Sequence, residues 1–102
     1  NFPPYIRLIE VEIKHKEDSK SDHVATMMAK RLKENLGNRV HGPFIPSIGR
    51  INNMYIRRIV IKIEKDAKMI KYVKNFLLFL KGEILNIEGV KNARIKIDID
   101  PY

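Results

Sequence analysis

Residues 55–64 read Tyr-Ile-Arg-Arg-Ile-Val-Ile-Lys-Ile-Glu and form the strongest strand pattern of the chain. Ile59, Ile61 and Ile63 fall on one face of an extended backbone. The other face carries the charged residues Arg58, Lys62 and Glu64. Alternation with a period of two predicts a strand that has one buried and one solvent-facing side.

The same alternation recurs near both ends of the chain, over residues 9–14 and 93–100. Residues 39–43 form a short apolar-polar segment, which predicts a fourth, brief strand that stops at Gly42-Pro43. Residues 44–53 read as a loop, because they contain proline, glycine, serine and a pair of asparagines. The sequence therefore predicts four strands.

Two segments carry apolar residues at helical spacing. For the first helix we expect Ser19, Ser21 or Asp22 as the N-cap and Gly37 as the C-terminal cap. For the second helix we expect Asp66 as the N-cap. The predicted buried stripe of the second helix consists of Ala67, Met69, Ile70, Val73, Phe76, Leu77, Leu80 and Ile84.

The predicted order is strand, helix, strand, strand, helix, strand, which indicates an α+β fold. Each strand has one apolar face and each helix one apolar stripe, so the simplest packing places two helices on one face of a four-stranded sheet. The other face, called the open face below, stays in water. We expect one domain over residues 1–102, with residues 1–4 as the end of a linker. The basic residues expected on or near the open face are Lys14, Arg58, Lys62, Arg94 and Lys96.

The composition narrows the possible functions. Lys and Arg total 20 against 12 Asp and Glu, and the resulting charge of +8 favours phosphate backbones or other acidic partners. The chain has no cysteine, which excludes disulfides, thiolate catalysis and cysteine-ligated zinc.

No apolar run is long enough to span a membrane, and we expect no membrane contact. The start, Asn1-Phe2-Pro3-Pro4, lacks an initiator Met and a signal peptide, so we expect an excised domain.

Catalytic chemistry is not evident in the sequence. His15, His23 and His41 lack metal-ligand spacing, and we expect all three to be solvated. Asp98 and Asp100 share one side of the last strand, but two carboxylates alone make a poor cation site. Glycines occur singly, so no phosphate-binding loop is formed. We expect neither an active site nor a bound cofactor in this chain.

The strongest functional signal is a basic cluster in the loop and the strand that follows it. Its members are Arg50, Tyr55, Arg57, Arg58 and Lys62. Arginine and lysine beside an aromatic ring are suited to contacts with the phosphates and bases of single-stranded or forked DNA. The alternative interpretation is an ordinary solvated strand face.

The same region, together with the end of the chain, resembles a known protein family. Residues 41–50 read His-Gly-Pro-Phe-Ile-Pro-Ser-Ile-Gly-Arg, the strand 55–62 follows, and residues 98–101 read Asp-Ile-Asp-Pro. In order and spacing these segments resemble the C-terminal domain of primosomal protein N prime, the PriA family of replication-restart helicases. The resemblance covers nearly the whole chain. One departure is that Tyr55 stands where family members often carry Trp.

The resemblance implies a four-stranded sheet with two helices and a parent protein that is an ATP-dependent 3'-5' DNA helicase of the bacterial cytoplasm and nucleoid. It implies that the parent binds ATP with magnesium, and zinc, outside these residues. It also implies recognition of stalled forks and contacts with other primosome proteins. Here the expected DNA contacts include Arg94 and Lys96. Lys65 and Lys68 are the expected contacts for the acidic tail of single-stranded-DNA-binding protein.

Two alternatives remain open at this point. A ribosomal or other RNA-binding domain has a similar topology and a similar charge, and comparing forked DNA with structured RNA would separate it from a DNA-binding domain. A pure protein-interaction module would bind neither nucleic acid at physiological salt.

Overall fold

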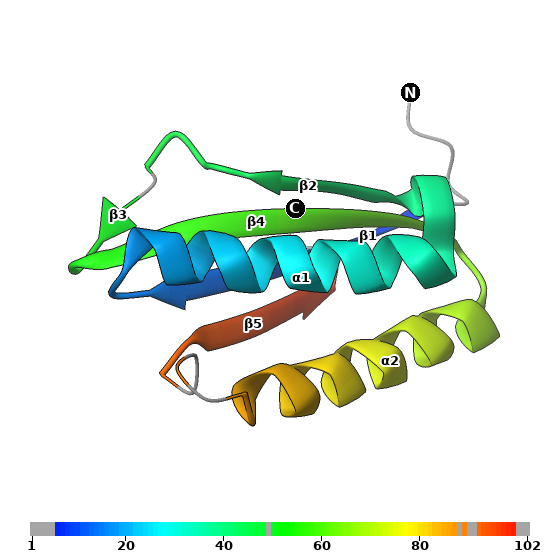
Figure 1. The fold of residues 1–102 in the computed structure, drawn as a ribbon. Coiled ribbons are helices and arrows are strands. Elements are labelled where there is room, and N and C mark those ends of the chain that lie inside the picture. The colour runs from blue at the N-terminus through cyan, green and yellow to red at the C-terminus, as the bar shows by residue number, and fades with distance from the viewer. Residues whose placement is uncertain (1–5, 49, 88, 90–91, 100–102) are drawn as a thin grey trace.

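The computed structural model describes residues 6–48, 50–87, 89 and 92–99, and Figure 1 shows a sheet with two long helices. Within these residues the strands are β1 (Ile6–His15), β2 (Val40–Phe44), β3 (Arg50–Ile51), β4 (Met54–Glu64) and β5 (Arg94–Ile99). The helices are α1 (Asp18–Leu36) and α2 (Ala67–Leu85), and a 3-10 turn, η1 (Gly37–Arg39), follows α1.

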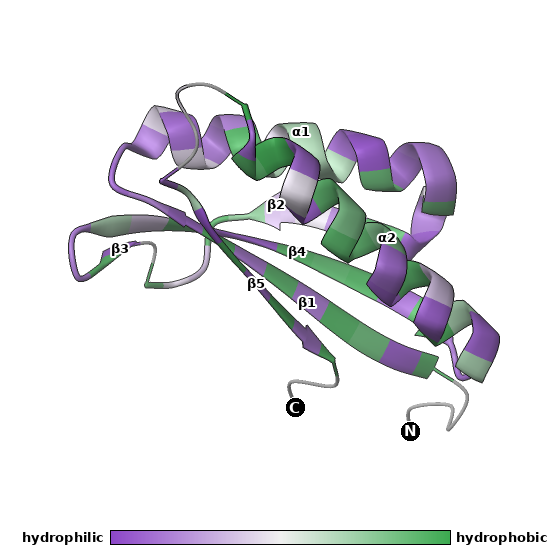
Figure 2. Ribbon diagram, turned by 90° about the horizontal axis from the view of Figure 1, so that it is seen from below, coloured by the Kyte–Doolittle hydropathy of each residue, from purple (hydrophilic) through white to green (hydrophobic). Residues whose placement is uncertain are grey.

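The sheet is antiparallel and its strand order is β2-β4-β1-β5, with β3 added to β4. On β1, Ile9 lies opposite Ile61 of β4 and Ile99 of β5, and the next pairs along the strands are also apolar. Directly paired residues point to the same face of a sheet, so one face is apolar across three strands. The alternating colours along β1 and β4 in Figure 2 show this pattern.

Both helices lie on the apolar face, as Figure 2 shows, and the predicted α+β architecture is confirmed. The buried core joins the inward residues of both central strands to one stripe of each helix. Its fully buried members include Ile9, Val11, Ile13, Val24, Met28, Leu32, Ile59, Ile61, Val73, Leu77 and Leu80.

The expected ends of the helices are partly confirmed. Gly37 ends α1 with a φ of 61°, and the Oδ1 of Asp66 caps α2 by accepting the backbone N–H of Lys68 at 3.0 Å. The predicted N-caps of α1 are wrong, because the helix begins at Asp18, and Ser21 and the other candidates lie inside it. Two of them bond to β4 instead: the Oγ of Ser21 donates to the carbonyl of Tyr55 at 3.0 Å, and Asp22 pairs with Arg57 at 3.4 Å.

The buried stripe of α2 is narrower than predicted. Val73, Leu77, Leu80 and Ile84 are buried, and Met69, Ile70 and Phe76 are half-buried against the core, but Ala67 is exposed. The segment 44–53, predicted to be a loop, contains the two-residue strand β3. Asn52 and Asn53 form the turn between β3 and β4 with φ angles of 53° and 64°.

Several expectations fall outside the described residues. These are the linker end at residues 1–4, with its Pro3-Pro4 pair, and the closing Asp100-Pro101. The single domain over 1–102 therefore stays a prediction. Among the described helices, none has the length and apolar character needed to cross a bilayer.

Candidate nucleic-acid interface

Cross-strand pairing arranges the side chains of the open face in rows across β4, β1 and β5. Successive rows are Ile56, Lys14 and Arg94; then Arg58, Glu12 and Lys96; then Val60, Glu10 and Asp98; and last Lys62 beside Leu8. All five basic residues expected on the open face lie on it. Four of them, Lys14, Arg58, Arg94 and Lys96, share the first two rows, which we call the basic end.

Carboxylates neutralise part of this surface, which the count of basic residues in the sequence does not show. Glu12, at the centre of the basic end, lies 3.1 Å from the Nζ of Lys14 and accepts a hydrogen bond from Arg58 at 3.2 Å. Burial raises the pKa of the Glu12 carboxyl, but Lys14 and Arg58 outweigh burial and leave that pKa below its ordinary value. Glu10 is a further partner of Arg58, at 3.3 Å. Arg58 is therefore held in place by two acids.

Three cations of the open face remain accessible to a ligand. Lys62 and Arg94 are exposed, and neither forms an ion pair with another described residue. The side chain of Lys96 is 69% exposed and lies 3.6 Å from Asp98, a loose surface pair. Because these side chains are solvated, they can contact phosphates without breaking a buried interaction.

The structure separates Arg57 from Arg58. Arg57 lies opposite Ile13 on the helix-facing side of the sheet, and its side chain is only 7% exposed. It pairs with Asp18 and with Asp22, the second at 3.4 Å, both on α1. The predicted basic cluster therefore does not form one surface at Arg57 and Arg58, since neighbouring residues of a strand point to opposite faces. Arg57 cannot reach a phosphate without giving up its two carboxylates.

Arg50 and Tyr55 lie side by side at the β3–β4 hairpin rather than on the open face. The guanidinium of Arg50 sits 5.1 Å from the centre of the Tyr55 ring, a cation–π contact, and donates to the side chain of Asn53 at 3.3 Å. Tyr55 is half-buried, and one face of its ring is occupied by Arg50.

Lys65 and Lys68 lie at the opposite end of β4 from this hairpin, where the strand passes into α2. Both are exposed, and neither forms an ion pair within the described part of the chain. The structure thus keeps the residues expected to bind a protein tail apart from the basic end.

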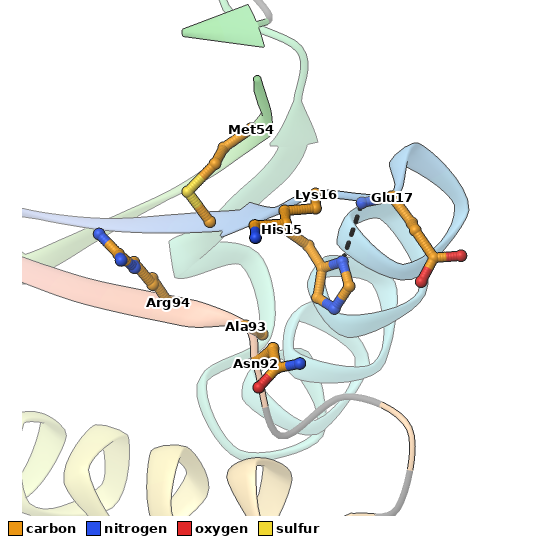
Figure 3. A pocket seen from close by; sticks show the side chains of 7 residues that line it. All are labelled: His15, Lys16, Glu17, Met54, Asn92, Ala93 and Arg94. Carbon is orange, nitrogen blue, oxygen red and sulfur yellow. Dashed lines mark hydrogen bonds between the residues drawn. The ribbon is translucent and has the colours of Figure 1, made fainter. Parts of the chain in front are cut away.

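The expectation for the histidines is wrong at His15. His23 is exposed and His41 half-buried, but His15 is only 4% exposed and lines a pocket of about 550 Å³, drawn in Figure 3. The sequence contained a usable signal, because His15 continues the phase of Ile9, Val11 and Ile13 toward the apolar face. The residues lining the pocket are His15, Lys16, Glu17, Met54, Asn92, Ala93 and Arg94.

The described residues do not fit the zinc that the resemblance implies for the parent protein. No three histidine, aspartate or glutamate side chains among them group closely enough to hold a metal ion, and the chain has no cysteine. No step is therefore assigned to a metal in this chain.

A protein-family model described as the primosomal protein N C-terminal domain matches residues 1–102, the whole chain. Among curated proteins, none matches the chain.

Proposed function

The chain belongs to the family of primosomal protein N C-terminal domains, and we propose that its open face binds single-stranded or forked DNA during replication restart. The observation that carries the proposal is the basic end, where cations from three adjacent strands lie in two neighbouring rows. Strands in a sheet are about 4.8 Å apart, so these cations form a continuous surface for a phosphate backbone.

The basic end and the residues around it have separate roles in this proposal. Lys96 and Arg94 are exposed and contact phosphates, and Lys62 extends the surface at the far end of β4. Arg58, fixed by Glu10 and Glu12, presents an oriented guanidinium to the same strand. The Arg50–Tyr55 pair supplies a stacking surface beside the sheet. Phosphate contacts carry no sequence information, so binding depends on salt and not on sequence.

We further propose that the chain works within a bacterial cytoplasmic helicase that recognises stalled forks, acts at the nucleoid and contacts other primosome proteins. Helicase activity, ATP with magnesium, and zinc are assigned to parts of that protein outside these residues. The support is the family match together with the chemistry of the chain, which offers no phosphate loop and no cysteine.

The DNA proposal predicts that the location of charge matters more than its amount. The double variant Lys62→Glu with Lys96→Glu should bind a single-stranded oligonucleotide about tenfold more weakly, and the slope of log K against log salt should fall by about 1.4, or 0.7 per lost contact. The matched control is Lys71→Glu with Lys74→Glu, two exposed lysines of α2. Fluorescence anisotropy at several salt concentrations measures both quantities.

Equal losses in the two double variants would contradict the proposal, since only net charge would then matter. Tighter binding of structured RNA than of forked DNA would favour the alternative of an RNA-binding domain. No binding to either nucleic acid at physiological salt would favour a pure protein-interaction module.

For the acidic tail of single-stranded-DNA-binding protein we propose Lys65 and Lys68 as contacts. Both are exposed where α2 begins, and the positive end of the helix dipole favours carboxylates there. Changing both lysines to Ala should weaken binding of an acidic, aromatic-ended peptide, measured by calorimetry, whereas Lys71→Ala with Lys74→Ala should not. Unchanged affinity in the first variant would move the site elsewhere, to Arg58 before any other residue.

A further inference from the structure

The pocket at the end of β1 exposes one polar atom of a mostly buried side chain, the Nε2 of His15. The Nδ1 of His15 accepts the backbone N–H of Glu17 at 2.9 Å, so the neutral ring carries its proton on Nε2. Among the described residues, Nε2 has no hydrogen-bond partner, and no fully buried side-chain nitrogen or oxygen lacks one. Nε2–H is therefore a donor that a ligand in the pocket can reach.

Other donors surround the same space. Figure 3 shows Asn92 on the same side of the pocket as the His15 ring, and Lys16 follows His15 directly in the chain. Lys16 is exposed and has no ion pair with any described residue. The carboxylate of Glu17 does not oppose an anion strongly, because it is paired with the Nζ of Lys20 at 2.9 Å.

We propose that this pocket binds a phosphomonoester, with the His15 Nε2–H, the Asn92 amide and the Lys16 ammonium as donors. A phosphomonoester has three unsubstituted oxygens and a charge of about −1.5 to −2 at neutral pH, which matches three donors, one of them a cation, better than a phosphodiester with one charge does. The nearby start of α1 at Asp18 adds the positive end of a helix dipole.

The position of Arg94 links this pocket to the open face. Arg94 lines the pocket and also belongs to the basic end, and Figure 3 shows its guanidinium pointing away from the His15 ring. A strand whose terminal phosphate enters the pocket can therefore place its next phosphate at Arg94 and continue over the open face. In this form the inference rests on the proposed DNA binding and adds that the chain recognises a phosphorylated strand end.

The first experiment compares oligonucleotides of one sequence that carry a 5'-phosphate, a 3'-phosphate or no terminal phosphate. We expect the chain to bind one phosphorylated form about tenfold more tightly than the unphosphorylated form. Lys16→Gln with Asn92→Ala should abolish this preference. The matched control, Lys62→Gln with Asn75→Ala, should weaken all three complexes and keep the preference. A chain without any preference, or a preference that survives in the pocket variant, would overturn the inference.

The second experiment does not depend on DNA binding. Inorganic phosphate and a nucleoside monophosphate are titrated into the isotope-labelled chain at constant ionic strength, with chloride as the reference ion. Saturable NMR shifts confined to the His15 ring nitrogens and the Asn92 side-chain amide support the inference even if DNA binding fails. A mononucleotide that binds as tightly as a phosphorylated strand would identify a free nucleotide as the source of the phosphate. Small shifts spread over many lysines would refute the site.

Discussion

The Ile61→Asp variant should not fold. Ile61 is completely buried, lies opposite Ile9 on β1 and Val40 on β2, and belongs to the core under both helices. Replacing it removes a large apolar side chain, at a cost of about 2–5 kcal/mol, and buries a carboxylate without a partner, which costs several kcal/mol more. Since domains are stable by only about 5–15 kcal/mol, we expect circular dichroism to show no cooperative thermal transition.

The neighbouring residue provides the control. Lys62 is exposed on the open face, so Lys62→Asp places the same carboxylate in the same strand, one position away, and should leave the cooperative transition in place. Ile61→Val should cost only about 0.5–1.5 kcal/mol. If Ile61→Asp folded cooperatively, or if Lys62→Asp unfolded the chain, the register of β4 described above would be wrong.

The fold could be predicted because its signals are local and repeated. The alternation in β1, β4 and β5 and the stripes of the two helices each identify an apolar surface, and few arrangements bury all of them. The N-cap of α1 was harder to predict, because three candidate caps follow one another and the sequence does not show which hydroxyl or carboxylate has a partner elsewhere. Ser21 and Asp22 have such partners on β4, which is distant in sequence.

The candidate site was predictable in its charge and not in its geometry. Arg57 and Arg58 are adjacent in the sequence, but the pleat of the strand places their side chains on opposite faces of the sheet. Arg57 is buried because α1 packs over its face of β4. The strict alternation of residues 55–64 already contained this separation. The pocket at His15 could not be foreseen from local pattern, because it joins the end of β1 to Asn92 and Arg94 near the other end of the chain.

The carboxylate partners of the buried Arg57 should contribute strongly to the stability of the fold. Its guanidinium is balanced by Asp18 and Asp22, which are themselves 58% and 60% exposed, and it donates to the carbonyl of Ile56 at 3.1 Å. Changing both aspartates to Ala leaves a buried charge with no counter-ion, which should lower the free energy of unfolding by about 3 kcal/mol. Urea denaturation of the two proteins measures the difference. The control, Glu34→Ala with Glu83→Ala, removes two exposed carboxylates and should cost no more than about 1 kcal/mol.

A third substitution separates the lost ion pair from other effects of the aspartate changes. Arg57→Met removes the buried charge and keeps most of the side-chain volume, so it should restore much of the stability that the double aspartate variant loses. In the unmodified chain the same change should be nearly neutral, because an apolar side chain of similar size replaces a neutralised pair. If Arg57→Met did not rescue the aspartate variant, the loss would come from the first turns of α1, where acidic residues favour the helix dipole. The ion pairs between β4 and α1 would then contribute little to the stability of the fold.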